Sequence, residues 1–342
     1  MHSEVILEGK GITKHFDAKV GLFKRTKIRA VDSVDVQLFK GEILALVGES
    51  GSGKTTLGRV LAGVYQLDAG EIHFAETSVT KTPRGRRRRE IAKKIQYVFQ
   101  DPFSSLPPNK KIRTLIQEVL RLYRPSNSEL EETTQIKSVL ELVGLTPAQQ
   151  IMDKYPHELS GGQRQRVSFA RALAVEPKVM IADEPVSMLD VSIRAGILEL
   201  MKKLRDEHGL SIIYITHDIT TARVISDTIY VMYRGKVVER GPIDAVVGRP
   251  LHPYTATLIS SLPSLTLGDS GFGSPIFQRT VENRSEPAGF DHCVFYSRCP
   301  MAVEICSQKE PALKEFPDNH YVACFLADKA LKGHAELYQN TS

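Results

Sequence analysis

The chain has 342 residues, of which 42% are hydrophobic and 25% are charged. This length is enough for a full buried core and predicts one large domain together with a smaller one. The composition is that of an ordinary globular protein. No run of about 18 apolar residues is present, so the sequence predicts no membrane-spanning helix. The start of the chain is charged at Glu4 and no apolar stretch follows, which argues against a secretory signal.

The net charge of +5 is modest, and much of the local positive excess lies in residues 84–89, which are mostly arginine. We interpret this segment first as a solvated basic loop. Contact with anionic lipid headgroups is the second interpretation. Nucleic-acid binding is the third, because no aromatic side chains are interleaved with the arginines to stack on bases.

The first predicted elements surround a glycine-rich segment. Val34, Val36 and Leu38 alternate with polar residues, as in a half-buried strand. The apolar run Ile43–Val47 predicts a strand buried on both faces. Beyond the glycines, four apolar residues fall on one face of a predicted helix: Leu57, Val60, Leu61 and Val64. Strand, glycine-rich loop and helix in this order form the context that identifies a phosphate-binding loop.

The glycine-rich segment fits the phosphate-loop pattern with Gly48, Glu49, Ser50, Gly51, Ser52, Gly53, Lys54 and Thr55. Glycine allows backbone N–H groups to converge on phosphate oxygens, and the following helix adds its positive N-terminal end. Lys54 is expected to reach the β and γ phosphates of a nucleoside triphosphate, and Thr55 to offer its hydroxyl to Mg²⁺. Thr56 completes the predicted phosphate-binding set.

Polar residues follow two further predicted strands. The apolar run 179–182 ends at Asp183 and Glu184, whose side chains diverge because they are adjacent on a strand. We assign Asp183 to Mg²⁺ through its water shell and Glu184 to polarising the attacking water. A second run, 212–215, is followed closely by His217. Since ligands bind at the carboxyl edge of open α/β sheets, His217 is expected to contact the γ phosphate and the attacking water.

Two helices are predicted to begin at capping residues. Ser160 is a good N-cap for a helix that starts with Gly161, Gly162 and Gln163. Asp190 is expected to begin another helix, which ends before Gly209.

The remaining segments predict shorter elements. Residues 96–99 form a predicted strand, and a proline-rich loop follows from Asp101. Residues 112–148 predict helices joined at Pro125 and Gly144. Residues 229–238 alternate about a central turn, as in a hairpin.

These motifs, in this order, resemble the ATP-binding subunit of an ABC transporter. The resemblance makes Gln100 the glutamine that senses the γ phosphate, which places it among the catalytic residues and the Mg²⁺ ligands. Residues 159–163 resemble the family's signature sequence and residues 187–190 its D-loop. Phe16 occupies the place of the aromatic residue that stacks on adenine, where Tyr is more usual.

The resemblance implies that the signature caps the nucleotide of a partner chain. The amides at the start of the signature helix form an anion site, and a single chain has no second triphosphate to fill it. ATP would therefore hold two subunits together, and hydrolysis would release them. The predicted contacts across the dimer come from Ser160, Gly161, Gly162, Gln163 and Asp190.

A closer resemblance, to the oligopeptide/dipeptide importer branch, covers nearly the whole chain. It is carried by residues 98–106, 155–158 and 252–255, whereas Pro107 and Pro108 depart from the Asn-Pro that is common there. The implied function is that of the ATP-hydrolysing, energy-coupling subunit of a peptide importer. An oligosaccharide or nickel importer of the same branch is the alternative. A soluble ABC ATPase and a regulatory nucleotide sensor are the more distant ones.

The four cysteines all lie near the C-terminus, at Cys293, Cys299, Cys306 and Cys324. A cytosolic chain keeps such residues reduced, which favours a metal site over disulfides. Their spacing lacks the close cysteine pairs that are usual in zinc sites. It is compatible with a [4Fe–4S] cluster, which some members of the branch hold. Zinc, with His292 or His320 as a substitute ligand, and no metal at all remain the alternatives.

The resemblance implies an α/β fold: a RecA-like P-loop ABC nucleotide-binding domain with a helical subdomain and an antiparallel β subdomain, plus a small cysteine-containing C-terminal module. We expect the ATP-binding domain at residues 1–260, with the helical subdomain at about 101–165. A linker at 261–287 and the cysteine module at 288–342 would follow.

The expected partners are a second ATP-binding subunit, identical or related, and two transmembrane permease subunits. An extracytoplasmic solute-binding protein would act indirectly, and no nucleic acid is expected. The expected location is the cytoplasmic face of a prokaryotic cell membrane.

Overall fold

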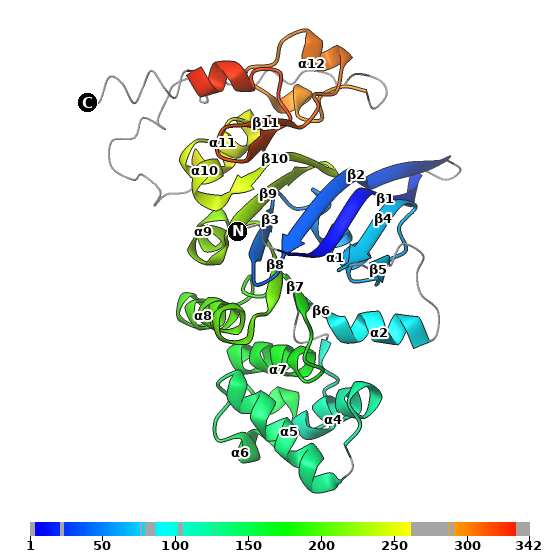
Figure 1. Ribbon diagram of the computed structural model, residues 1–342, viewed down its shortest axis with the longest axis vertical. Helices are drawn as coiled ribbons and strands as arrows, with labels where there is room; N and C mark the ends of the chain where they lie inside the picture. The colour runs from blue at the N-terminus through cyan, green and yellow to red at the C-terminus, as the bar shows by residue number, and fades with distance from the viewer. Residues whose placement is uncertain are drawn as a thin grey trace, which may run out of the picture. The chain divides into compact units, whose positions relative to one another are not determined.

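The computed structural model describes residues 4–20, 24–75, 77–78, 86–101, 105–126, 128–260, 287 and 291–332. The chain forms two compact units, whose elements are drawn in Figure 1. The first unit comprises Met1–Lys10, Val36–Ile43 and Thr55–Ile215, and the second comprises Gly11–Asp35, Leu44–Lys54 and Thr216–Ser342. Within the described residues, no helix has the length and apolar character needed to span a membrane.

Parallel strands form the centre of the first unit. Strand β7 (Val179–Asp183) pairs in parallel with β6 (Ile95–Val98) and with β8 (Ser211–Thr216). All residues of β7 and β8 are buried, as expected of parallel strands that are covered on both faces. Because the three strands are parallel, the polar residues that follow them emerge at one edge.

A second sheet has the order β2-β1-β4-β5. Its strands are β1 (Val5–Val20), β2 (Lys24–Phe39), β4 (Ala69–Phe74) and β5 (Thr77–Ser78). Val34, Val36 and Leu38 are buried on β2, as their alternation predicts.

Helices make up most of the rest of the first unit. They are α1 (Lys54–Leu61), which begins at the boundary between the units, α2 (Arg86–Lys94), α4 (Ile112–Tyr123), α5 (Glu129–Leu142), α6 (Ala148–Met152), the short 3-10 helix η1 (Pro156–Glu158), α7 (Gly161–Leu173) and α8 (Val191–His208). Helix α8 begins at Asp190, which accepts a hydrogen bond from the Ile193 amide, and ends at Gly209 in the left-handed conformation. Both ends of α8 agree with the sequence prediction.

The second unit is built on strand β3 (Ile43–Val47), which pairs in parallel with β9 (Thr228–Tyr233). A tight turn connects β9 to the antiparallel strand β10 (Lys236–Pro242), which confirms the predicted hairpin. The other elements are α9 (Ile219–Ile225), α10 (Ile243–Gly248), α11 (Pro253–Ser260), the 3-10 helix η2 (Tyr296–Arg298) and α12 (Ile305–Gln308).

The cysteine-containing region extends this sheet. Strand β12 (His320–Val322) pairs antiparallel with β10, and β11 (Lys314–Phe316) pairs antiparallel with β12. Leu251, Val322 and Ala327 form a small buried cluster beside the hairpin. The region therefore gains its stability partly from backbone pairing with the strands that precede it.

Two local predictions are wrong. Helix α1 ends at Leu61, and Val64 is 44% exposed, because the chain turns at Gly63, where φ is +68°. The basic segment is not a loop where the structure describes it, since residues 86–94 form helix α2. The predicted linker at 261–287 lies outside the described residues, except for Pro287.

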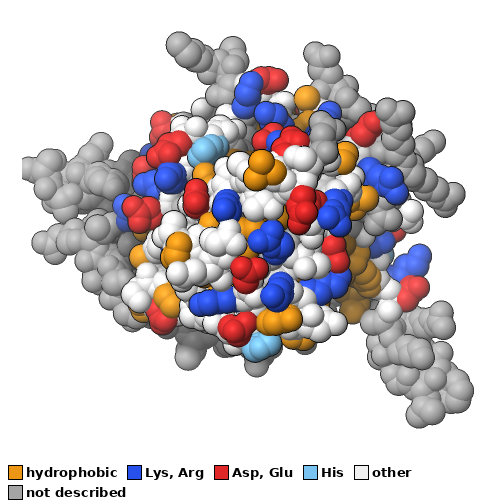
Figure 2. Space-filling model, turned by 90° about the horizontal axis from the view of Figure 1, so that it is seen from below, with side chains coloured by type: hydrophobic (Ala, Val, Ile, Leu, Met, Phe, Trp, Pro, Cys, Tyr) orange, Lys and Arg blue, Asp and Glu red, His pale blue; other side chains and the backbone are white. Residues whose placement is uncertain are grey.

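Charges of both signs are mixed on the molecular surface that Figure 2 shows. In the first unit, Arg121 pairs with Glu132 and Lys110 with Glu118. A face of this kind differs from the single-sign basic patch that nucleic acid selects.

A buried carboxylate joins β10 to the cysteine-containing region. The Glu239 and His320 side chains are both 0% exposed, and the His320 Nε2 lies 2.7 Å from a Glu239 oxygen. Glu239 also accepts hydrogen bonds from the backbone amides of Leu251 and His252. A buried carboxylate is stable only when its hydrogen bonds are satisfied. These partners therefore hold β12 and the residues just before α11 against β10.

Replacing Glu239 with Ala is expected to cost about 2–4 kcal/mol of unfolding free energy, since it leaves three buried donors without an acceptor. Urea unfolding measures this. Asp318→Asn is the control, because asparagine tolerates the φ of +68° at this position. The Arg249–Asp318 pair that it weakens is largely exposed on the Asp318 side and is worth at most about 1 kcal/mol. Equal losses in the two variants would contradict the buried role of Glu239.

Candidate nucleotide-binding site

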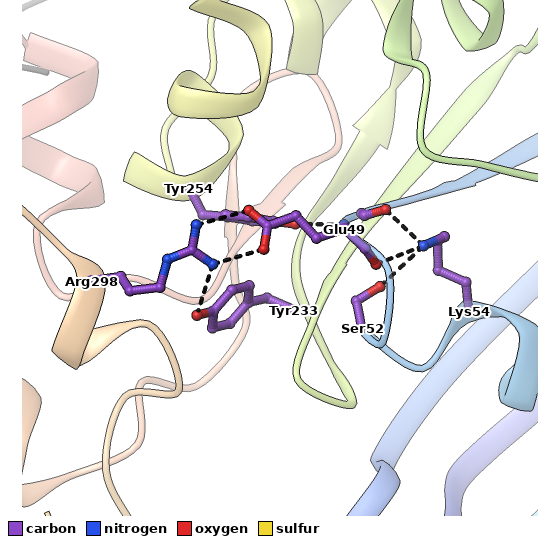
Figure 3. A network of polar contacts seen from close by, with 7 residues as sticks. Glu49, Ser52, Lys54, Tyr233, Tyr254 and Arg298 are labelled. Carbon is purple, nitrogen blue, oxygen red and sulfur yellow. Dashed lines mark hydrogen bonds and ion pairs between the residues drawn. The ribbon is translucent and has the colours of Figure 1, made fainter. Parts of the chain in front are cut away.

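The phosphate loop is held by its own lysine. The Lys54 Nζ donates to the carbonyl oxygens of Gly48 and Glu49 at 2.7 and 2.8 Å, and lies 3.4 Å from the Ser52 hydroxyl (Figure 3). Lys54 is only 4% exposed. The loop therefore curves around the Lys54 ammonium group.

The loop needs glycine where the backbone passes close to its neighbours. A Cβ at Gly53 would lie 2.2 Å from the Ala30 carbonyl oxygen, and its φ is +105°. No other residue fits there without moving the backbone. The remaining loop residues, Ser50 and Gly51, are exposed, and Thr56 begins the body of α1 beside Thr55.

Asp183 joins three elements of the first unit. It lies at the end of β7 and is 1% exposed. Its Oδ1 accepts a 2.9 Å hydrogen bond from the Thr55 hydroxyl at the start of α1. Its Oδ2 accepts a 2.7 Å hydrogen bond from the Tyr97 hydroxyl on β6. Two of the three residues predicted to hold Mg²⁺, Thr55 and Asp183, thus lie together, with oxygen atoms of the kind that Mg²⁺ prefers.

Tyr97 was not identified from the sequence. Burial, and then the charge of Asp183, raise the pKa of the Tyr97 hydroxyl well above its ordinary value, so it stays a hydrogen-bond donor. The only sequence signal is its place in the strand beside β7. A tyrosine in a predicted strand is ordinary core material, and its partner Asp183 is 86 residues away.

Glu184 and Gln100 lie side by side. The Gln100 Nε2 donates to the Glu184 Oε2 at 3.0 Å. Glu184 has a φ of +44°, which is unusual for a residue with a Cβ, and its amide donates to the Ile215 carbonyl. This conformation turns the chain immediately after Asp183, and such strain is common at functional sites.

The signature helix α7 begins with a reciprocal cap. The Ser160 Oγ accepts from the Gln163 amide at 3.3 Å, and the Gln163 Oε1 accepts from the Ser160 amide at 3.1 Å. A Cβ at Gly162 would lie 2.4 Å from a methyl of Ile193, so only glycine allows α7 to pack this closely on α8. Gly161 is half-buried at the first turn.

The remaining predicted site residues are Phe16, His217 and Asp190. Phe16 is 39% exposed, with Lys14 over its ring, which leaves ring surface for stacking. His217 is exposed directly after β8. Asp190 caps α8, and the Ile193 amide and the Ser192 hydroxyl lower the pKa of its carboxyl. Nucleotide contact by these three residues stays a prediction.

The four cysteines all lie within the described residues and are not joined in disulfides. Cys293, Cys299 and Cys306 are buried, and the Cys293 amide donates to the Cys306 carbonyl. Burial, and then the other cysteines, raise the pKa of the Cys293 thiol to about 11 and that of Cys324 to about 12. Nevertheless, no three His, Cys, Asp or Glu side chains of the described residues are grouped to hold a metal ion.

Comparisons with known proteins decide the family. A family model described as ABC transporter matches residues 31–187, and one described as the C-terminal region of oligopeptide/dipeptide transporters matches residues 238–306. The chain is 41% identical over 330 residues to the oligopeptide transport ATP-binding protein AppF of Bacillus subtilis (strain 168), covering 95% of this chain and 98% of that protein. The chain belongs to the family of oligopeptide/dipeptide ABC transporter ATP-binding proteins.

Other relatives agree with this family membership. The chain is 40% identical over 339 residues to the oligopeptide transport ATP-binding protein OppF of Salmonella typhimurium (strain LT2), covering 95% and 97% of the two chains. A dimeric structure of the ATP-binding cassette MJ0796, bound to ADP and Pi, matches with a TM-score of 0.62 and 28% identity, covering 69% of this chain and 98% of that one. These findings confirm the predicted α/β ABC fold and the ABC-type ATPase function, including its place in oligopeptide or dipeptide transport.

Replacing Tyr97 with Phe is expected to raise the Mg²⁺ concentration needed for half-maximal ATP hydrolysis by several-fold, since Asp183 loses a hydrogen bond that orients it. Second partners of metal ligands commonly contribute about tenfold or more. ATPase activity titrated with Mg²⁺ measures the effect. The control is Tyr65→Phe, which removes a hydroxyl that accepts a 2.9 Å hydrogen bond from Arg59. An unchanged Mg²⁺ requirement in the Tyr97 variant would show that the contact does not tune the site.

Proposed function

We propose that the chain hydrolyses ATP at a site completed by a second ATP-binding subunit, and that this drives the import of oligopeptides or dipeptides. The observation that carries the proposal is the contact of Asp183 with Thr55, 2.9 Å long, beside the 3.0 Å contact of Glu184 with Gln100. A metal-binding acid and a catalytic base thereby occupy neighbouring positions at the end of one parallel strand.

Each side chain has a distinct chemical task in this proposal. Lys54 and the loop amides would bind the phosphates, and Thr55, Asp183 and Gln100 would hold Mg²⁺, which neutralises charge on the phosphate oxygens when bound. Glu184 would accept a proton from the attacking water. His217 would contact the γ phosphate, and Phe16 would stack on adenine.

The partner subunit would supply the other half of the site. The capped start of α7 presents its N-terminal dipole end, which favours an anion. Ser160, Gly161, Gly162 and Gln163 would then contact the γ phosphate held by the partner, with Asp190 beside them. The dimeric cassette that this chain resembles, bound to ADP and Pi, supports such an arrangement.

The names of the relatives support a peptide cargo rather than sugars or nickel. Oligopeptide and dipeptide transport proteins from several bacteria match nearly the whole chain. We place the subunit at the cytoplasmic face of a prokaryotic membrane, bound to two permease subunits. A solute-binding protein on the far side would deliver the cargo.

We further propose a [4Fe–4S] cluster at Cys293, Cys299, Cys306 and Cys324. The support is the set of four cysteines within one short segment, of which Cys299 and Cys306 contribute to the raised pKa of both the Cys293 and the Cys324 thiol. Their spacing lacks the close cysteine pairs that are usual in zinc sites, which favours the cluster over a zinc ion.

Replacing Glu184 with Gln is expected to preserve ATP binding, reduce turnover by at least about 100-fold, and trap a dimer, because the proton acceptor is lost while the phosphate contacts remain. Light scattering with ATP and Mg²⁺ measures the dimer. Adding Ser160→Arg to this variant should restore the monomer without loss of nucleotide binding. A Glu184→Gln chain that stays monomeric with ATP and Mg²⁺ would count against the composite site.

Protein purified without oxygen is expected to be brown and to contain about four iron and four sulfide ions per chain. Iron and acid-labile sulfide analysis measures this, and Cys306→Ser is expected to lower both. Iron-free protein that contains one zinc ion, or no metal, would contradict the cluster.

A further inference from the structure

An arginine from the cysteine-containing region contacts the phosphate loop. Arg298 belongs to η2, directly before Cys299. Its two terminal guanidinium nitrogens donate to the two oxygens of the Glu49 carboxylate, at 2.7 and 2.9 Å (Figure 3). The two residues are 249 positions apart in the sequence. A two-point pair of this kind fixes the direction of both side chains, not only their distance.

Glu49 is also held through its backbone. Its amide donates to the Tyr254 hydroxyl at 2.8 Å, and its carbonyl accepts from Lys54 at 2.8 Å. The side-chain contact with Arg298 is therefore the third point that fixes this residue. Lys54 donates to the Glu49 carbonyl oxygen, so a shift of Glu49 would also move the Lys54 ammonium group. That group is expected to contact the phosphates.

The position of Arg298 depends in turn on the cysteine segment. Phe295 is 3% exposed and packs its ring against Tyr233 and Tyr254, with ring centroids 5.2 and 5.4 Å apart. The Arg298 guanidinium lies over the Tyr233 ring, at 5.7 Å. Since Phe295 and Arg298 both lie between Cys293 and Cys299, the fold of the cysteine segment sets where the guanidinium points.

We propose that Arg298 is a positioning residue for the phosphate loop, through which the cysteine-containing region sets the affinity for MgATP. The inference rests on the proposed ATP site. Glu49 places a negative charge in a loop that would receive a triphosphate. Arg298 neutralises that charge and directs the carboxylate toward the cysteine region.

The test is MgATP binding by calorimetry on the full chain, together with KM and kcat of ATP hydrolysis. Arg298→Gln is expected to raise Kd and KM about two- to fivefold, the range for a partly exposed ion pair, with kcat nearly unchanged. Arg298→Lys should give a smaller increase, because it keeps the charge but loses the two-point contact. Adding Glu49→Gln to Arg298→Gln should bring Kd back toward the original value, since no unpaired carboxylate remains.

Arg249→Gln is the matched control. It breaks an ion pair with Asp318, also in the C-terminal part of the chain, and contacts none of the phosphate-loop residues described. It should leave Kd, KM and kcat unchanged. An original chain that binds no MgATP would refute the proposed function itself.

A chain that binds MgATP but is insensitive to Arg298→Gln would refute only the positioning role, as would an equal effect of Arg249→Gln. Should Arg298→Gln fail to fold, the Lys variant decides: an unchanged Kd and KM would overturn the inference.

Discussion

The buried carboxylate of Asp183 is the constraint around which the catalytic end of the first unit is arranged. At 1% exposure it requires hydrogen-bond donors, and it receives them from Thr55 and Tyr97. The start of α1, the end of β7 and strand β6 are thereby fixed to one another. Glu184 follows in the left-handed conformation, and its side chain accepts a hydrogen bond from Gln100. The carboxylates proposed to bind the metal and to accept the proton are thus on adjacent residues.

Features that depend on neighbouring residues could be predicted from the sequence. The buried strands follow from unbroken apolar runs, as at β7 and β8. The caps of α7 and α8 follow from Ser160 and Asp190, because a capping side chain bonds an amide only three residues away. The place of the glycine-rich loop follows from its position between the apolar run Ile43–Val47 and the apolar face of the next helix.

Features that join distant segments could not be predicted. Tyr97 and Asp183 are 86 residues apart, and Glu239 and His320 are 81 apart, so no local pattern connects them. Periodicity also misjudged the end of α1, because Val64 continues the apolar spacing although the chain has already turned. The family resemblance indicated which residues carry the chemistry, but not which side chains orient them.

The hairpin of β11 and β12 has a further consequence for how the protein behaves in a crowded cell. Strand β10 has seven residues, and without β12 its backbone would offer an open ladder to any other extended chain. The hairpin pairs with β10 at Glu239 and Arg240 and places β11 beyond it. Strand β11 is only three residues long and begins with Lys314. Short, charged borders of this kind discourage copies from stacking edge to edge. The C-terminal hairpin thus leaves a shorter, charged strand where another extended chain could add to the sheet.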